Sequence, residues 1–313
     1  MVKNYFKKII AVFVCVCAFA SLVSCTYENN TNIKDTDKLN IVTTLFAHYD
    51  FARIIAKDKA DVSLLLPPGV ESHTYEPSPA DIIKIKNSDL FIYTGEHMES
   101  WASGIIDNLD KQKTTVLNVS ENIELSHTGD EHHDNHSHRV DPHIWTSPAN
   151  AIIMVQNICD TLCEIDSSNS QTYIDNANAY INELTQLDNE FTEMISQSKH
   201  KKIMFGGRFA MHYFTRHYGL EHKSAYDSCS SEAEPSARLV ADIIDEMKEN
   251  GICTIYYEEM SNHNVADQIA QEIDGTALLL HSCHNVSHEE ISSGASYLSL
   301  MRQNLINLKK GLN

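Results

Sequence analysis

Basic residues are scarce in this chain, which has 24 lysines and arginines against 43 aspartates and glutamates among its 313 residues. The formal net charge at pH 7 is −19. Because such a surface repels the phosphates of nucleic acids and anionic lipid headgroups, we expect no nucleic-acid partner. The same charge favours cations, although an acidic surface alone is a weak indication of what a protein binds.

The chain also lacks the short motifs of several enzyme classes. It contains no HExxH helix of the kind found in metalloproteases, no nucleophile elbow and no glycine-rich loop that could hold a phosphate. It has no internal repeat either, so a repeat-built adhesin finds no support. These absences favour a binding protein over an enzyme.

No apolar segment is long enough for a confident transmembrane helix. Three lysines within residues 1–8 precede an apolar run over 9–23, which is the order of a secretory signal. The run ends in LVSC, which resembles a bacterial lipobox with Cys25 as the acylated residue. We predict a lipoprotein signal peptide over 1–24 and a fold outside the cytoplasm, lipid-anchored to the cell membrane or periplasmic. An uncleaved anchor or an ordinary signal is the alternative.

Cysteine is too sparse for a disulfide scaffold. Two of the eight cysteines fall in the signal and Cys25 carries lipid, which leaves an odd number that cannot all pair within the chain: Cys159, Cys163, Cys229, Cys253 and Cys283. At most one or two bridges are expected. Cys229 to Cys283 is the first candidate, because both residues follow predicted strands of the same half.

Two similar halves follow a polar tether over 25–37. Short β-rich segments alternate with amphipathic ones, which is typical of parallel strands with helical crossovers. The first half contains LNIVTTL, DVSLLL, DLFIYTG and TTVLNVS, and the second contains KKIMFGG, EHKSAYD, CTIYYEE and TALLLHS. We predict the α/β class, with an N-terminal lobe over 38–165 and a C-terminal lobe over 200–313, each built on a parallel sheet.

One long helix is predicted between the lobes, within residues 166–199. Apolar residues recur there in steps of four and three: Tyr173, Ala177, Tyr180, Leu184, Leu187, Phe191 and Met194. A helix from 169 to 198 would be about 45 Å long, at about 1.5 Å per residue, and could brace two lobes. A coiled-coil dimer would give the same spacing, but two flanking lobes need a connector, so we expect a monomer.

A histidine-rich segment over 126–139 contains almost no apolar residues and cannot join a core. Its histidines are His127, His132, His133, His136 and His138, with acidic residues among them. Because neutral imidazole suits zinc, copper and nickel, we interpret the segment as an accessory loop that collects metal loosely. A solvated loop without a role is the alternative.

Two further histidines lie where an α/β fold places ligands, just beyond strand ends. They are His73 in GVESHTYEPSP and His143 in DPHIWTSP. Taken alone, each fits an ordinary loop histidine better than a metal ligand.

Several long motifs favour the interpretation of these two histidines as metal ligands. GVESHTYEPSPADI, DPHIWTSPANA, YIDNANAYINELTQLDNEF, EAEPSA and YLSLMRQNLINLKKGL resemble the zinc and manganese solute-binding lipoproteins of ABC importers, and the resemblance covers nearly all of residues 39–311. It implies two α/β lobes joined by a rigid helix, with one metal ion between them that passes to a permease served by an ATPase.

The resemblance also implies a ligand set. His73 and His143 match the family's two ligands in the N-terminal lobe. The third family position falls on Arg208, whose guanidinium cannot bind a cation. His212 could replace it only if the following helix began elsewhere. The fourth position, usually an aspartate, aligns with His281.

Three histidines, His73, His143 and His281, with water or a further side chain would then form a nitrogen-rich site. Such a site favours Zn²⁺ over Mn²⁺. Cys283 and His284 are close enough in sequence to substitute. We expect Arg208 to pair with a carboxylate, for which Glu258, Glu259 and Glu234 are candidates.

The predicted function is therefore capture of a divalent transition metal, zinc first, for an ABC importer. A zinc hydrolase with Glu258 as its base, or a surface adhesin on the same scaffold, are the alternatives.

Overall fold

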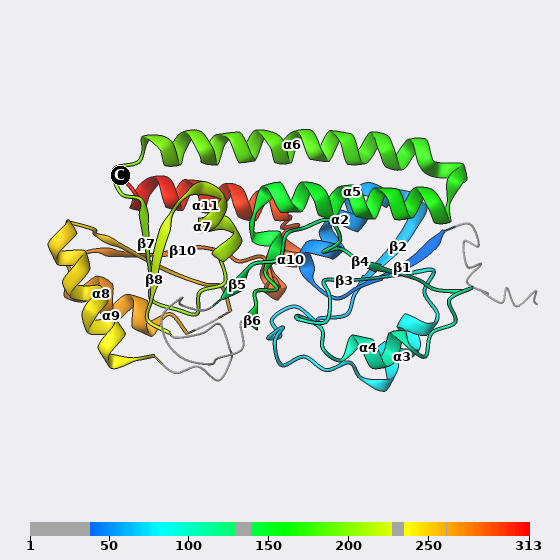
Figure 1. Ribbon diagram of the computed structural model, residues 1–313, viewed down its shortest axis with the longest axis horizontal. Helices are drawn as coiled ribbons and strands as arrows, with labels where there is room; N and C mark the ends of the chain where they lie inside the picture. Colours follow the sequence, from blue (N-terminus) through cyan, green and yellow to red (C-terminus); the bar gives the residue numbers. More distant parts are fainter. Residues whose placement is uncertain (1–37, 129–138, 227–234, 261) are drawn as a thin grey trace, which may run out of the picture. The chain divides into compact units, whose positions relative to one another are not determined.

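Two parallel four-stranded sheets organise the part of the chain described by the computed structural model, which covers residues 38–128, 139–226, 235–260 and 262–313 (Figure 1). The strand orders are β2-β1-β3-β4 and β10-β9-β7-β8. Counted within each sheet, both orders place the first strand between the second and the third. The α/β class with two parallel-sheet lobes, predicted from the sequence, is confirmed.

All eight strands predicted from the β-rich segments are present. The first sheet contains β1 (Leu39–Thr43), β2 (Ala60–Leu64), β3 (Leu90–Tyr93) and β4 (Thr115–Asn118). The second contains β7 (Lys202–Phe205), β8 (Glu221–Ser224), β9 (Thr254–Tyr257) and β10 (Thr276–Leu279). A short antiparallel pair, β5 (His127–Thr128) and β6 (Arg139–Val140), lies at the two ends of the histidine-rich segment.

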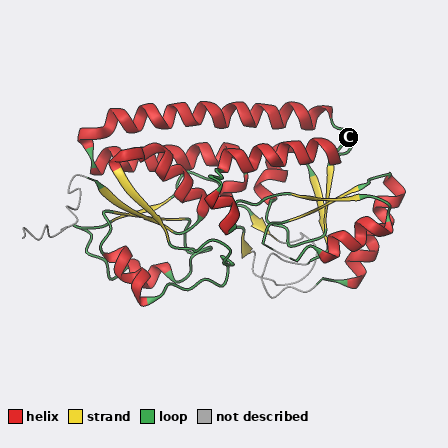
Figure 2. Ribbon diagram, turned by 180° about the vertical axis from the view of Figure 1, so that it is seen from behind, coloured by secondary structure: helices red, strands yellow, loops and turns green. Residues whose placement is uncertain are grey.

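Helices connect the strands and cover both sheets (Figure 2). In the first half they are α2 (Phe46–Ala56), α3 (Pro79–Lys86), α4 (Ala102–Ile106) and α5 (Pro148–Ile165). In the second half they are α7 (His212–Tyr218), α8 (Ala237–Asn250), α9 (Asn264–Glu272), α10 (His288–Ser292) and α11 (Tyr297–Gly311). Between them runs α6 (Ser170–Gln197), and short 3₁₀ turns span Lys57–Lys59, Ile144–Thr146 and Ser167–Asn169.

Local sequence fixes where several helices begin and end. α3 starts with a reciprocal capping box between Ser78 and Asp81, and Pro79 occupies its first position. α10 starts with the same device between Ser287 and Glu290. α7 ends at Gly219, whose φ of 65° lies in the left-handed region that glycine adopts without strain.

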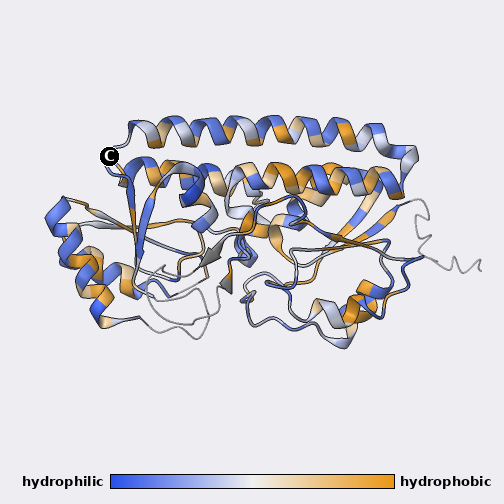
Figure 3. Cartoon of the chain, in the orientation of Figure 1, coloured by the Kyte–Doolittle hydropathy of each residue, from blue (hydrophilic) through white to orange (hydrophobic). Residues whose placement is uncertain are grey.

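Helix α6 lies alongside α5, α2 and α11 and so contacts elements from both halves. Its buried residues are Tyr173, Ala177, Tyr180, Leu184, Leu187, Phe191 and Ile195. Figure 3 shows the rest of the helix as mostly hydrophilic. The predicted apolar stripe is therefore present, with Ile195 in place of Met194 at its end.

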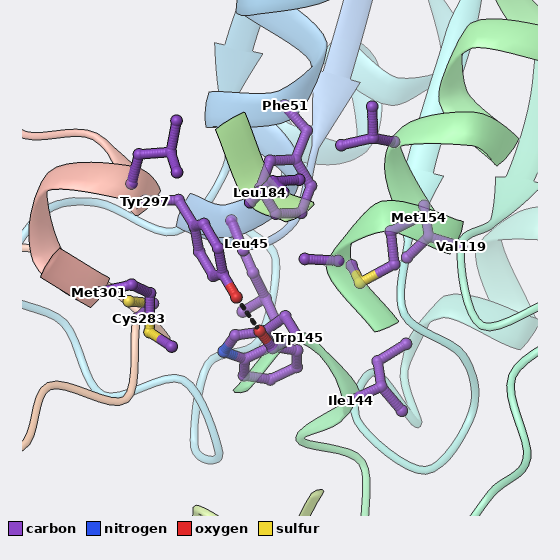
Figure 4. Packing of buried hydrophobic residues seen from close by; sticks show 14 of the residues in the cluster. Leu45, Phe51, Val119, Ile144, Trp145, Met154, Leu184, Cys283, Tyr297 and Met301 are labelled. Atoms are coloured by element: carbon purple, nitrogen blue, oxygen red, sulfur yellow. Dashed lines mark hydrogen bonds between the residues drawn. The ribbon is translucent and has the colours of Figure 1, made fainter. Parts of the chain in front are cut away.

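The largest hydrophobic cluster continues from one half into the other beneath α6. Figure 4 shows its centre, where Tyr297 of α11 points toward Trp145 and lies near Phe51 of α2. The Tyr297 hydroxyl donates a hydrogen bond of 2.7 Å to the Trp145 carbonyl, and its backbone N–H donates to Asp50 Oδ2 at 2.8 Å. These bonds fix the C-terminal helix onto the first half.

No helix among the described residues is long and apolar enough to cross a membrane.

A buried polar network lies between the carboxyl ends of β1 and β3. Thr44 and Thr94 donate hydrogen bonds to Glu99 Oε1 at 2.5 and 3.1 Å, and the Thr94 and Gly95 amides donate to Glu99 Oε2 at 3.1 Å each. The ring nitrogens of His48 lie 3.2 and 3.3 Å from the two threonine hydroxyls. Burial lowers the pKa of His48 to about 3 and raises the pKa of Glu99 to about 7.

Replacing His48 with glutamine is expected to flatten the loss of stability in acid. The folded protein keeps His48 neutral down to about pH 3, whereas the unfolded chain protonates it near 6.5. The contribution of neutral His48 is therefore complete above about pH 6.5 and is lost as the pH falls toward 3. Between about pH 7 and pH 4.5 the folded protein binds a proton at Glu99 that the unfolded chain does not, so this group raises stability as the pH falls. The effect is the same in the wild type and in His48→Gln, so it cancels when the two are compared.

The measurement is urea unfolding of both metal-free proteins across this pH window. Below about pH 6.5 the unfolding free energy of the wild type should fall relative to His48→Gln by about 1 kcal/mol per pH unit. Parallel profiles for the two proteins would show that His48 does not titrate as its burial implies.

Candidate metal centre

Three histidines from three separate loops converge on one point. His73 lies in the loop after β2, His143 immediately precedes the 3₁₀ turn at Ile144–Thr146, and His284 lies in the loop after β10. One ligand atom from each ring lies within 4.8 Å of the other two. Among the described residues, no other group of three or more histidine, cysteine or acidic side chains is arranged in this way.

The spacing of these histidines suits a tetrahedral ion. His73 Nε2 and His143 Nε2 are 3.2 Å apart, and the centroids of the His143 and His284 rings are 4.6 Å apart. In a tetrahedral zinc site with Zn–N bonds of about 2.0–2.1 Å, two nitrogens are separated by about 3.3 Å. A zinc ion would therefore fit between the His73 and His143 nitrogens with little movement.

His143 is held by Asp141, two residues earlier in the chain. Asp141 Oδ1 lies 2.5 Å from His143 Nδ1 and also accepts a hydrogen bond of 2.9 Å from the His143 amide. The carboxylate thereby places the ring proton on Nδ1 and leaves the Nε2 lone pair for a metal. Burial opposes ionisation of Asp141, but His143 holds the pKa of this carboxyl below its ordinary value.

His284 is oriented in a similar way through a serine. Ser282 Oγ donates its only proton to Glu259 Oε1 at 2.6 Å, so the same oxygen must accept from His284 Nδ1, with which it forms a short contact. His284 Nε2 is left buried, with no hydrogen-bond partner among the described residues. Burial, followed by the nearby His143 and His73, lowers the pKa of His284 well below its ordinary value. The ring is therefore neutral at pH 7, as metal binding requires.

Trp145 forms an apolar wall behind the cluster. Its ring lies edge-on to His143 and His284, with centroids 5.6 and 5.0 Å away. The indole N–H donates a hydrogen bond of 2.8 Å to the Ser282 carbonyl. This bond joins the loop that carries His143 to the loop that carries His284, so it helps to fix the distance between ligands from the two halves.

His281, the third ligand predicted from the sequence, does not lie with His73 and His143. It is 1% exposed, and its Nδ1 accepts a hydrogen bond of 2.9 Å from the Cys283 amide. Its Nε2 lies 3.4 Å from Glu290 Oε1. Asn304 bonds both its amide and its carbonyl at 2.7 Å. His284, which the sequence suggested only as a substitute, is the residue that joins His73 and His143 in the structure.

Arg208 lies beside the cluster and carries two carboxylate partners. Its Nε is 3.4 Å from Glu258 Oε1, and its Nη2 is 3.2 Å from Glu71 Oε2. Glu258 is one of the three partners considered from the sequence. Glu71 belongs to the His73 loop, so the second pair links the loop after β7 to the loop after β2.

The other residues singled out in the sequence lie away from the three nitrogens or outside the described residues. His212 begins α7 and packs edge-on against Phe209 and His222. Cys283 is buried among the hydrophobic residues shown in Figure 4. The described ranges do not include Cys25, Cys229, Glu234, His132, His133, His136 or His138, and of His127 they give only the backbone of β5.

Sequence reasoning missed three residues that orient the site. Asp141 is the first letter of the quoted DPH motif, and a carboxylate two residues before a proposed ligand was a usable signal. Ser282 lies between the two candidate histidines of HSCH, and a serine at that position gave no indication that it orients a metal ligand. Glu71 was hidden because its partner Arg208 is 137 residues away.

Residues 41–311 match the protein family described as zinc-uptake complex component A, periplasmic. The chain is 34% identical over 316 residues to the high-affinity zinc uptake system protein ZnuA of Bacillus subtilis, with 98% of both chains covered. It is 36% identical over 312 residues to the zinc-binding lipoprotein AdcA of Streptococcus pneumoniae. That match covers 97% of this chain and 61% of AdcA, so the chain spans less than two thirds of the length of this relative.

Solved structures show the same likeness. The Zn(II)-bound ZnuA-like domain of Streptococcus pneumoniae AdcA superimposes with a TM-score of 0.76 at 35% identity, over 88% of this chain and 99% of that one. The laminin-binding protein Lmb of Streptococcus agalactiae, described as a bifunctional protein with adhesin and metal transporting activity, gives a TM-score of 0.76 at 27% identity, over 88% and 100%. The chain thus belongs to the family of the periplasmic zinc-uptake component A.

Proposed function

We propose that this protein captures Zn²⁺ outside the cytoplasm and delivers it to an ABC permease driven by its ATPase. The observation that carries the proposal is the convergence of His73, His143 and His284. Two of their rings are set by hydrogen bonds that leave Nε2 open for a metal. Three nitrogen donors suit zinc better than manganese, which prefers more oxygen ligands. The names of the relatives, ZnuA and the zinc-binding lipoprotein AdcA, support the same cargo.

Purified, metal-stripped protein is expected to bind one zinc ion tightly at this cluster and any further ions weakly. The test is a zinc titration against a competing chelator, with a version that lacks residues 126–139 as a matched control for the histidine-rich segment. The tight site should survive that deletion. Loss of tight binding together with the segment would move the main site away from the three histidines.

Capture fits the surroundings of the cluster better than hydrolysis, the alternative considered from the sequence. A zinc hydrolase needs a general base beside the open coordination position. Glu258, the base suggested from the sequence, is paired with Arg208 at 3.4 Å. Burial raises the pKa of Glu258 and Arg208 only partly opposes this, but the guanidinium occupies Oε1, an oxygen that would otherwise take a proton from water. We therefore propose a monomeric binding protein rather than an enzyme.

We also propose that Cys25 carries the lipid that holds the protein to the membrane. The signal-like segment 1–24 and the lipobox-like LVSC support this, as does the lipoprotein named among the relatives. Cys25→Ala is expected to abolish incorporation of labelled palmitate and to move the protein from the membrane fraction to the soluble fraction. Cys253→Ala, at an exposed cysteine, is the control. Membrane retention of Cys25→Ala without label would indicate an uncleaved anchor instead.

A further inference from the structure

The three-histidine cluster leaves one zinc coordination position open. Zinc sites of this kind are four-coordinate, and three imidazoles fill three positions. Across the described ranges, no carboxylate or thiol joins His73, His143 and His284 within ligand distance. Within the described ranges, the fourth donor is therefore a small molecule or a side chain that moves when the metal enters.

A cationic side chain borders this open position. Arg208, His73 and His284 line the same cavity. The guanidinium uses Nε for Glu258 and Nη2 for Glu71, and Nη1 has no hydrogen bond or ion pair among the described residues. Arg208 is 18% exposed at its side chain, so it is held largely inside the cavity.

At the open position itself the charges favour an anion. The imidazoles are neutral, and the Asp141 and Glu259 carboxylates are bonded to His143 Nδ1 and Ser282, whereas Arg208 brings a fixed positive charge to the cavity. Glu71 and Glu258 offset that charge, but both lie on the guanidinium rather than on the histidine cluster. An anion between the metal and Arg208 would interact favourably with both charges in a partly buried setting.

The cavity limits the size of such an anion. Its volume is about 40 Å³. Because one water molecule needs about 10–15 Å³ by the same measure, the space suits about three positions, enough for a metal ion and a very small ligand. A planar oxyanion with two oxygens on one carbon matches the guanidinium fork better than a spherical halide does.

We propose that Arg208 recruits a small carboxylate-like oxyanion, of the size of formate or bicarbonate, as the fourth zinc ligand. One oxygen binds the metal and the other accepts a hydrogen bond from Arg208. This inference rests on the proposed zinc function and deepens it, because zinc and anion would be captured together. Zinc should then raise the affinity for the anion by the same factor as the anion raises the affinity for zinc.

The competing explanation is that Glu71 leaves Arg208 and becomes the fourth ligand itself. Glu71 is two residues from His73, and its Oε1 accepts a hydrogen bond of 3.3 Å from the His73 amide. In that case Glu71→Gln would weaken zinc binding strongly in every buffer. The oxyanion proposal instead expects the zinc affinity of Glu71→Gln to retain its dependence on added anion.

The experiment measures zinc affinity of the full-length metal-stripped protein by chelator competition. The buffer is a sulfonate free of carboxylates and carbon dioxide, at constant pH and ionic strength. Formate and bicarbonate are added separately, which distinguishes an organic from an inorganic source. Benzoate is the control, because its ring exceeds the cavity. Formate or bicarbonate should raise affinity about tenfold, within the usual range for coupled ligands, and benzoate should not.

A second readout uses cobalt(II) in place of zinc, because its visible spectrum reports the ligands of a tetrahedral ion. The spectrum of the wild-type protein should change on adding formate or bicarbonate. In Arg208→Gln the anion-dependent gain in affinity should fall below about twofold, whatever zinc affinity that variant has.

If the zinc affinity of the wild type is equal in all buffers and the cobalt spectrum does not change, the proposal of an anionic fourth ligand is wrong, while the proposal of zinc capture is unaffected. Failure to bind zinc in any buffer would overturn both.

Discussion

Replacing His284 with alanine is expected to weaken zinc binding at least about a hundredfold, whereas His281→Ala should change it less than about tenfold. His284 Nε2 faces the His73 and His143 nitrogens, so its loss removes a direct donor. His281 Nδ1 accepts a hydrogen bond from the Cys283 amide, and its Nε2 makes no hydrogen bond but faces Glu290 Oε1 at 3.4 Å, so His281 is not among the three clustered donors. Loss of a direct donor should exceed the tenfold to hundredfold loss typical of supporting residues.

The measurement is zinc affinity by chelator competition on both variants. The control is His263→Ala, at a half-exposed histidine beside Asp267. Because His281 is buried, circular dichroism must first show that His281→Ala is folded. A greater loss at His281 than at His284 would restore the ligand set inferred from the family resemblance and contradict the arrangement in the structure.

Phe191→Ala should lower the free energy of unfolding by about 3–5 kcal/mol, the usual cost of removing a buried phenylalanine ring. Phe191 is fully buried on α6, and its ring packs against Phe214 and Tyr218 with centroids 5.0 and 5.4 Å away. Those two residues belong to α7 of the second half. The substitution therefore removes packing that holds the long helix to that half.

Ile174→Ala on the same helix is the matched control, because Ile174 is 40% exposed. It should cost less than about 1 kcal/mol. Urea unfolding of the metal-free proteins measures both values. Similar losses for the two variants would mean that the buried stripe of α6 contributes no more to stability than its solvent side does.

Periodicity was sufficient to predict the scaffold. Eight β-rich segments became eight strands, because alternation with amphipathic segments permits few arrangements other than parallel sheets. The stripe of α6 was predictable for the same reason, except at its end. There Ile195 rather than Met194 is buried, because steps of three and four only approximate 3.6 residues per turn.

The site was only partly predictable, because ligand choice depends on the path of a loop. His281 and His284 are three residues apart, and periodicity gives no reason to choose between them. Between them Cys283 has a φ of 61°, in the left-handed region that non-glycine residues seldom adopt. That turn directs His281 toward Asn304 and Glu290 and leaves His284 to face His73 and His143.

The division of the three donors between the two halves has a consequence for the release of cargo. His73 and His143 belong to the first half and His284 belongs to the second. Moving the loop after β10 away from the two loops that carry His73 and His143 would therefore remove one zinc donor in a single step. If losing His284 as a donor costs as much zinc affinity as predicted for His284→Ala, this single displacement would weaken zinc binding about a hundredfold. A transporter that pulls on one loop could thus empty the site without unfolding either sheet.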